Sequence, residues 1–357
     1  MTGKERISRI LKHQPVDRIG VYENFWNDTV TDYVASGNIK PGVDFDDHFG
    51  FDMSIVLPFN MTADLDYEPE TISETDETVM VRDGNGAVLR HHKLHDTTPE
   101  HVDFTVKTRE DWEKIKPLLL NPDPRRINFD LYRYIKRTSE NAGRFLAVAM
   151  LSVFECMHPV CGHENLLVGM LLDPDWILDM TQTYTELLIG LQDILFEAEG
   201  PPDGVWYYED MGFKGKPFLS PELYKELLFP SHKRAFGYAH SLGLPVIVHS
   251  CGFIEPLLPG LIEAGMDCLQ AIEVKAGMDL MRIYENYGDQ IALMGGIDAR
   301  TLCSNDKAAI EAELMQKLPA VKQKFGYIAH SDHSIPNTVT YETFRFYLQK
   351  VLELGTY

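Results

Sequence analysis

Residues 244–252 read Leu-Pro-Val-Ile-Val-His-Ser-Cys-Gly, an apolar run that ends in two chemically active side chains. Such a run is typical of a buried strand in a parallel sheet, and side chains alternate between the two faces of an extended backbone. His249 and Cys251 therefore point to the same side, at the end of the expected strand. An imidazole and a thiolate placed in this way suit Zn²⁺. The His-x-Cys pattern alone is weak, because a buried cysteine is more often only a small apolar residue.

This stretch is one of eight short apolar segments that alternate with amphipathic helical segments. The expected strands lie at residues 19–22, 52–57, 145–150, 204–208, 245–249, 268–271, 291–294 and 327–329. Alternation of strands and helices predicts a parallel sheet covered by helices, and eight such units predict a (β/α)₈ TIM barrel. In barrels of this kind the chemistry takes place at the C-terminal ends of the strands.

Two segments fall outside this alternation. A helix is expected from Thr2 or Gly3 to about His13, as part of an N-terminal extension. Further on, two apolar segments flank Asp-Gly-Asn-Gly at residues 83–86, which is a strong hairpin signal and predicts a β-hairpin insertion at residues 78–93. Because no repeat or linker divides the chain, we expect a single domain over residues 1–357.

Composition limits the classes of function. The formal net charge of -21 disfavours binding to nucleic acid or to an anionic membrane surface. The 5 cysteines are few and scattered, which does not resemble a disulfide framework and favours a cytoplasmic location. No apolar run approaches the ~20 residues of a membrane span, and no export signal is expected.

Ionisable side chains follow most of the later strands. They are Glu209, Asp210, His249, Cys251, Glu273, Asp298, His330, Asp332 and His333. Packing does not explain so many of them at strand ends. Single cases have simpler explanations, since Glu209 and Asp210 can equally cap the following helix and Gly295-Gly296 is more readily a tight turn. The proline in Ile335-Pro336 restricts the loop that carries His333, as expected for a ligand.

Four blocks together carry a resemblance to a known family. They are residues 208–212 (Tyr-Glu-Asp-Met-Gly), 248–252 (Val-His-Ser-Cys-Gly), 293–298 (Leu-Met-Gly-Gly-Ile-Asp) and 326–336, which ends in Ser-Asp-His-Ser-Ile-Pro. In these blocks the chain resembles the uroporphyrinogen decarboxylase superfamily, and specifically its corrinoid-dependent, zinc-containing methyltransferase branch. The start of the chain, from Glu5-Arg6 to Asp17-Arg18, also fits.

The resemblance implies a zinc site and a corrinoid partner. In that branch a His-x-Cys pair and a later cysteine bind zinc, so His249 and Cys251 are expected ligands, with His333 at the position of the later cysteine. A His₂Cys site leaves the ion more positive, which suits polarisation of an ether, amine or alcohol as well as a thiol. The implied reaction moves a methyl group between such a small substrate and methylcobalamin. No Asp-x-His-x-x-Gly signature occurs, so the corrinoid is expected on a separate protein, as in methanogenic or acetogenic one-carbon metabolism.

Other residues receive roles by position. Glu209 is the first candidate for an additional ligand or proton handler and Asp210 the second, while Asp332 is expected to orient His333 or another ligand. Phe25, Trp26 and Tyr208 are candidates for the substrate pocket, although core packing is the commoner role of an aromatic residue.

Two alternative functions stay open. The true uroporphyrinogen decarboxylases resemble one another in an N-terminal arginine-rich segment that binds substrate carboxylates and in an aspartate after an early strand that contacts the pyrrole nitrogens. This chain has no arginine cluster near its N-terminus and no acidic residue directly after the strand at residues 52–57, so a tetrapyrrole decarboxylase is disfavoured. A non-catalytic barrel that binds a small ligand would have no need of converging His, Cys and His.

Overall fold

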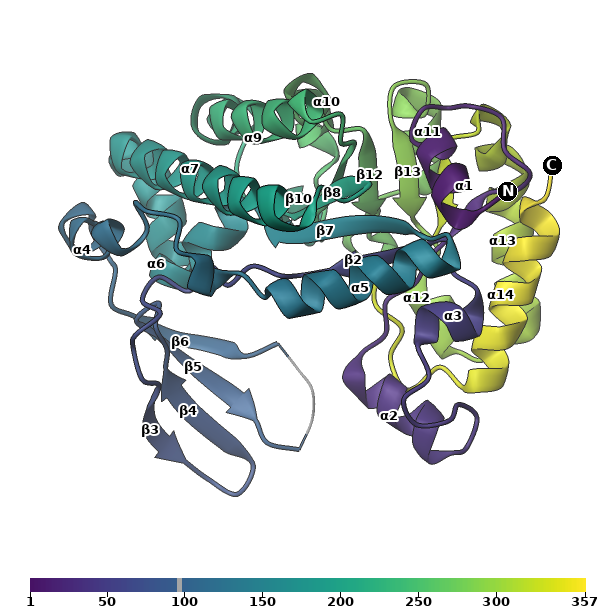
Figure 1. Cartoon of the computed structure of the whole chain (residues 1–357), viewed down its shortest axis with the longest axis horizontal. Coiled ribbons are helices and arrows are strands. Elements are labelled where there is room, and N and C mark those ends of the chain that lie inside the picture. Colours follow the sequence, from purple (N-terminus) through teal and green to yellow (C-terminus); the bar gives the residue numbers. More distant parts are fainter. Residues whose placement is uncertain (95–97) are drawn as a thin grey trace.

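The computed structural model describes residues 1–94 and 98–357 (Figure 1). Eight strands form one sheet in the order β1-β14-β13-β12-β11-β8-β7-β2, and each paired neighbour is parallel. The strands are β1 (Gly20–Val21), β2 (Met53–Val56), β7 (Phe145–Leu151), β8 (Gly204–Tyr208), β11 (Val246–His249), β12 (Cys268–Ala271), β13 (Ala292–Gly295) and β14 (Tyr327–Ala329). The predicted eight strands and the (β/α)₈ barrel are confirmed.

Helices surround the sheet and bury its outer face. They are α1 (Gly3–Ile10), α2 (Asn27–Ala35), α3 (Phe45–Phe49), α4 (Arg109–Ile115), α5 (Phe129–Ala142), α6 (Val153–Leu172), α7 (Pro174–Glu199), α8 (Pro221–Leu223) with a π-helical turn at Tyr224–Leu228, α9 (Phe229–Ser241), α10 (Leu258–Ala264), α11 (Leu280–Tyr287), α12 (Ala299–Cys303), α13 (Lys307–Val321) and α14 (Tyr341–Gly355). The strands are almost wholly buried because helices cover one face and strand side chains fill the barrel interior. Helix α1 ends at Ile10, earlier than predicted, and a capping box of Thr2 and Glu5 starts it.

Asp52 closes the barrel between β1 and β2, the two ends of the strand order. Its backbone N–H donates to the Val21 carbonyl (2.9 Å), and its carboxylate accepts the Val21 N–H (2.8 Å). Arg6 and Arg18 donate to the same carboxylate at 2.5 and 2.6 Å. The N-terminal segment therefore supplies the charges that hold the first barrel strand to the second.

The insertion is larger than predicted. The expected hairpin is present as β4 (Thr78–Arg82) and β5 (Ala87–His92), but β3 (Glu70–Glu74) and β6 (Glu100–Phe104) extend it to a four-stranded antiparallel sheet. We call these four strands the insertion sheet. Figure 1 shows it projecting from the barrel on the same side as α2. Strands β5 and β6 pack against α6, which fixes the sheet beside the barrel.

The described helices include none that is both long and apolar enough to cross a membrane. A short two-stranded ribbon, β9 (Gly212–Phe213) with β10 (Lys216–Pro217), follows β8 and leads into the helices that cover β8 and β11.

Candidate active site

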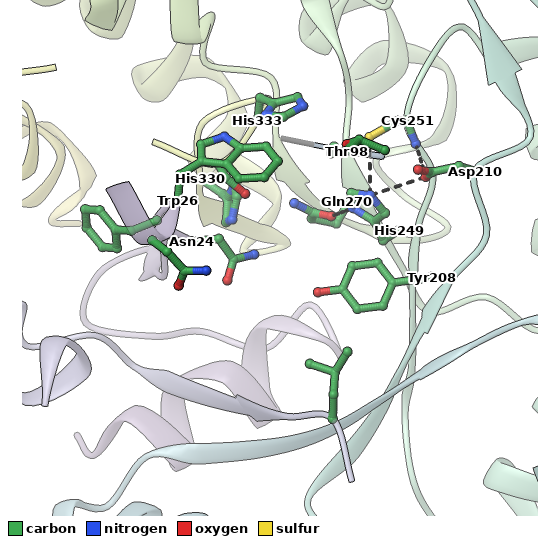
Figure 2. A pocket seen from close by; sticks show the side chains of 15 residues that line it. Asn24, Trp26, Thr98, Tyr208, Asp210, His249, Cys251, Gln270, His330 and His333 are labelled. Carbon is green, nitrogen blue, oxygen red and sulfur yellow. Dashed lines mark hydrogen bonds and ion pairs between the residues drawn. The ribbon is translucent and has the colours of Figure 1, made fainter. Parts of the chain in front are cut away.

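A cavity of about 680 Å³ opens at the C-terminal ends of the barrel strands (Figure 2). Its lining combines aromatic rings, amides and ionisable groups. The lining residues are Asn24, Phe25, Trp26, Asn27, Leu57, Thr98, Tyr208, Asp210, His249, Cys251, Gln270, Ala271, His330, His333 and Ser334. The volume lies within the ~300–1,000 Å³ that is typical of small-molecule sites.

Asp210, His249 and Cys251 form a compact group in this cavity. Each offers one ligand atom, and these atoms lie within 4.8 Å of one another. His249 Nε2 is 3.3 Å from Cys251 Sγ and 3.3 Å from Asp210 Oδ1. A carboxylate, an imidazole and a thiolate form a donor set that suits Zn²⁺. We call these three residues the Asp-His-Cys group.

The other ring nitrogen of His249 is also engaged. Nδ1 donates to Gln270 Oε1, which leaves Nε2 directed at Cys251 and Asp210. A hydrogen bond of this kind fixes the tautomer and orientation of a metal-binding histidine. Gln270 therefore selects the nitrogen that faces the Asp-His-Cys group.

Strand register and two glycines assemble this group. Tyr208 of β8 lies opposite His249 of β11, so Asp210 and Cys251, two residues further along each chain, emerge side by side. The Cys251 N–H donates to Asp210 Oδ1 at 2.7 Å. Gly252 has φ of 80°, and a Cβ there would lie 2.2 Å from the Gly212 carbonyl carbon. Only glycine permits this crossing, which holds the Cys251 loop against the loop after β8.

Charge within the group is coupled. Burial works against a charged His249, but Cys251 and Asp210 raise its pKa well above the usual value. Burial alone would raise the pKa of the Asp210 carboxyl, but the neighbouring His249 keeps this pKa below its usual value. Burial raises the pKa of the Cys251 thiol. A metal ion would replace the proton of the imidazole and that of the thiol, because metals bind the deprotonated ligands.

His333, predicted as the third ligand, lies outside the Asp-His-Cys group. Its exposed side chain stacks on Trp26, with ring centroids 5.9 Å apart, at another part of the cavity wall. The Ile335 N–H donates to the Asn24 carbonyl at 2.8 Å and ties the His333 loop to the loop after β1. Asp210, and not His333, lies next to His249 and Cys251, because β8 adjoins β11 whereas β14 does not.

Glu209 and Asp332 are held away from these ligand atoms. Glu209 has no exposed surface; its carboxylate accepts the backbone N–H groups of Phe154 (3.0 Å) and Glu155 (3.3 Å) and pairs with His232 at 2.6 Å. It therefore caps the start of α6, a helix that comes earlier in the sequence, and not the helix that follows Glu209. Asp332 accepts the N–H groups of Val274 and Ala299, so it fixes the loops after β12 and β13.

The three aromatic candidates all line the cavity, in different ways. Tyr208 packs edge-on against His249, with centroids 4.9 Å apart. Trp26 covers His333, and Phe25 is packed within a cluster of phenylalanines that includes Phe49 and Phe344. Phe25 thus has mainly the packing role that the sequence left open, whereas Tyr208 and Trp26 offer ring surface next to the ionisable groups.

His330 is a site residue that sequence reasoning left without a role. Its Nδ1 donates to the Ser331 carbonyl, so Nε2 is an acceptor, and this buried atom has no hydrogen-bond partner among the described residues. Burial lowers the pKa of His330 to about 4, so the ring is neutral at pH 7. Its place directly after β14 was the only signal. Gln270 likewise belongs to a strand end, but an amide carries no metal-site signal of its own.

Comparisons with known proteins bear on the family. Residues 91–354 match the family model described as uroporphyrinogen decarboxylase (URO-D). The methylcobamide:CoM methyltransferase of Methanosarcina acetivorans is 25% identical over 339 residues, which cover 89% of this chain and 88% of that protein. The methylated-thiol–coenzyme M methyltransferase of Methanosarcina mazei is 30% identical over 87 residues, or 24% of this chain and 22% of that protein.

A solved structure shows the same fold. The structure of a methyltransferase from Methanosarcina mazei covers 99% of both chains with a TM-score of 0.67, at 14% identity. Together with the two curated relatives, which are named as methyltransferases, this confirms the resemblance drawn from the sequence blocks.

Proposed function

The chain belongs to the uroporphyrinogen decarboxylase (URO-D) family, and from this premise we propose that it is a zinc-dependent methyltransferase. It moves a methyl group between a small methylated compound and the cobalt of a corrinoid carried by a separate protein. The observation that carries the proposal is the Asp-His-Cys group, whose ligand atoms lie within 4.8 Å of one another in a cavity at the barrel mouth. The naming of two curated relatives as methyltransferases supports the reaction class.

Asp210, His249 and Cys251 would hold the zinc ion, and Gln270 would keep His249 in its binding orientation. When bound, zinc supplies a Lewis acid for the heteroatom that carries or receives the methyl group. Three protein ligands leave a fourth position open, which is typical of catalytic rather than structural zinc. We assign the third position to Asp210 instead of His333, on the strength of its 3.3 Å approach to His249.

The remaining wall residues bind and orient the substrate. His330 Nε2 can accept a hydrogen bond from a substrate hydroxyl or N–H group, because it has no partner among the described residues. Tyr208 and Trp26 provide ring surface that excludes water from the methyl group. The apolar methyl group would pack against these rings, which leaves the ionisable side chains free to contact the heteroatom of the substrate.

The lining also indicates the charge of the substrate. Among the described residues that line the cavity there is no lysine or arginine. Lys275 and Arg300 line a neighbouring cavity of about 250 Å³, which shares Trp26 and His333 with the first. We therefore propose an uncharged or cationic substrate, such as a methyl ether, a methylamine, an alcohol or a thiol without a strongly anionic group. The same lack of cations argues against a tetrapyrrole decarboxylase, whose substrate carries many carboxylates.

The test combines metal content with methyl transfer. We expect about one zinc per chain at the Asp-His-Cys group in protein purified without an affinity metal. Cys251→Ala and Asp210→Asn should each lower zinc affinity at this group by at least ~10-fold, because loss of even an outer contact to a metal ligand typically costs ~10–100-fold. His333→Gln should retain the metal, since its side chain stacks on Trp26 outside the group.

Activity is then measured with free cob(I)alamin and a panel of neutral, cationic and anionic methyl compounds. Transfer that needs both zinc and Cys251 supports the proposal. If His333→Gln loses zinc and Asp210→Asn keeps it, the third zinc ligand is His333 and not Asp210. A folded wild type with neither zinc nor transfer would refute the methyltransferase and leave a small-ligand-binding barrel.

A further inference from the structure

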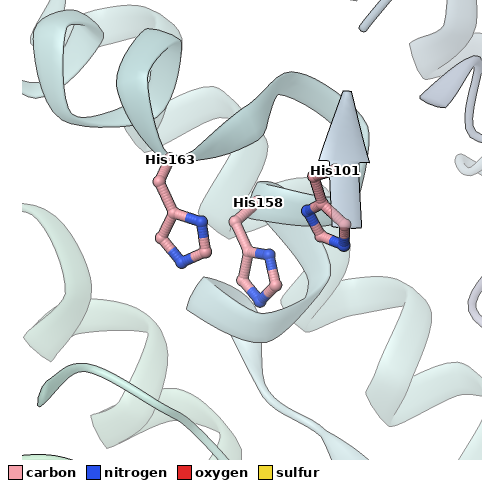
Figure 3. Close-up of side chains that lie close together, drawn as sticks. All are labelled: His101, His158 and His163. Carbon is pink, nitrogen blue, oxygen red and sulfur yellow. The ribbon is translucent and has the colours of Figure 1, made fainter. Parts of the chain in front are cut away.

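Three histidines from two separate elements converge outside the cavity just described (Figure 3). His101 belongs to β6 of the insertion sheet, and His158 and His163 belong to α6. Each ring offers one nitrogen, and these three atoms lie within 4.8 Å of one another. The proposed methyl transfer uses none of them.

The backbone of α6 is shaped so that two of these histidines meet. In an unbroken helix, residues five apart point in directions roughly 140° apart and do not share a face. Here Pro159 lies within α6, and Gly162 leaves helical geometry with φ of 76° and ψ of 153°. As a result the rings of His158 and His163 stack with centroids 4.3 Å apart.

The insertion sheet reaches the same break in the helix. A Cβ at Gly162 would lie 2.4 Å from the Phe104 ring, so β6 packs directly on the backbone at the kink. This contact brings His101 to within 5.8 Å of His158 between ring centroids. The convergence therefore depends on contacts between two elements that are distant in sequence.

Hydrogen bonding leaves a nitrogen of His158 ready to bind. Its Nε2 is 2.8 Å from Glu155 Oε1, while its buried Nδ1 has no partner among the described residues. A carboxylate that orients a histidine through its second nitrogen is the arrangement typical of metal-binding histidines.

We propose that His101, His158 and His163 form a second metal site, for a divalent transition-metal ion such as Zn²⁺, Ni²⁺ or Co²⁺. Imidazole nitrogens select these ions over Mg²⁺ or Ca²⁺, which prefer oxygen ligands. The ion fastens the insertion sheet to α6. Because Thr98, two residues before β6, lines the substrate cavity, fastening β6 also fixes one wall of that cavity. The competing explanation is a purely packed ring cluster, since His163 also contacts Phe154 and Phe218.

Cobalt titration of the full-length, metal-free chain without a histidine tag tests this proposal. Wild type should bind two Co²⁺ per chain, and only one of them should show the thiolate-to-cobalt charge-transfer band of a cysteine ligand. Cys251→Ala should remove that band and keep the second ion. His101→Gln and His163→Phe should each weaken the second ion at least 10-fold and keep the thiolate band. His163→Phe preserves a ring against Phe218, so its loss of metal is not a loss of packing.

His240→Gln is the matched control, because His240 lies on the barrel surface in a pair with Asp267. It should bind both ions as wild type does. Hydrogen exchange gives a second readout. Added Zn²⁺ should slow the exchange of the β5 and β6 amides in wild type, and it should leave their exchange rates unchanged in His101→Gln. A second ion that persists in His101→Gln and His163→Phe, or no ion beyond the one with the thiolate band, overturns the proposal. If the thiolate band is missing but the histidine-dependent ion remains, only the function proposed above fails.

Discussion

At the scale of the residue, Glu23 shows how burial sets the behaviour of a carboxyl group. It is 2% exposed and accepts hydrogen bonds from the Ser331 N–H (2.8 Å), the Ser331 hydroxyl (2.7 Å) and the Tyr347 hydroxyl (2.6 Å). Burial raises its pKa to about 7, although these three donors act in the opposite direction. Glu23 thus joins the loop after β1 to the loop after β14, although burial removes its carboxylate from water and destabilises the charged form.

This raised pKa predicts a specific dependence of stability on pH. The folded-state pKa of about 7 exceeds the usual 4.5, so the folded protein holds the Glu23 proton more tightly than the unfolded chain does. The stabilisation is complete below the unfolded pKa and is lost as pH rises through the folded pKa. The loss amounts to about 3 kcal/mol. We expect urea unfolding to show this loss as the pH rises from 4.5 to about 7. Over that range the free energy of unfolding of wild type should fall by about 3 kcal/mol relative to that of Glu23→Gln. A difference that stays constant with pH would contradict the prediction.

Asp210, His249 and Cys251 could be named from the sequence, but their grouping and the part played by Gln270 could not. His249 and Cys251 were found because a strand-end His-x-Cys pair is a chemical signal in itself. Glu209 and Asp210 look equivalent in sequence, yet adjacent residues point in opposite directions and only Asp210 faces the cavity. The choice between Asp210 and His333 depends on which strands are neighbours, and strand order follows from long-range packing.

At the scale of the element, the barrel strands were predictable and the edges of the insertion sheet were not. Buried barrel strands are continuous apolar runs, which a sequence displays directly. Strand β3, Glu-Thr-Ile-Ser-Glu, is exposed along its whole length and carries no such pattern. The closure of the barrel was also hidden, because it depends on side chains of Arg6, Arg18 and Asp52 meeting across the fold.

Asp52→Ala should therefore destabilise the barrel far more than an ordinary surface substitution. It would leave the buried Arg6 without one of its two carboxylate partners and remove the acceptor of the Val21 N–H. Breaking a buried ion pair costs about 3–5 kcal/mol. Thermal unfolding should show a large fall in Tm. Asp66→Ala is the control, since its pair with Arg125 is exposed at both ends and should leave Tm unchanged. Equal Tm values for the two variants would refute the role of Asp52 in closing the barrel between β1 and β2.

At the scale of the whole molecule, the proposed function requires a corrinoid protein to dock at the mouth of the barrel. The cavity of about 680 Å³ has the size of a small-molecule site. In the proposed reaction the corrinoid would therefore approach from outside, with its protein on the rim. The insertion sheet and α2 project on the same side of the barrel and form parts of that rim (Figure 1). The insertion sheet carries exposed apolar side chains at Ile72 and Val102, and Leu94, after β5, is 69% exposed. Exposed apolar residues on a rim are typical of an interaction surface.

We therefore expect Leu94→Asp to weaken docking of the corrinoid protein without affecting chemistry. The charge would have to be desolvated in the interface, so KM for the corrinoid protein should rise at least ~10-fold, equivalent to about 1.4 kcal/mol. The rate with free methylcobalamin should stay unchanged, because Leu94 does not line the cavity. Met315→Asp is the matched control: Met315 is 59% exposed on α13, which belongs to the outer layer of the barrel. Steady-state transfer assays with both forms of the corrinoid separate the two effects. An equal loss with free and protein-bound corrinoid would assign Leu94 to the cavity instead of the docking surface, and no loss with either would place the docking surface elsewhere on the rim.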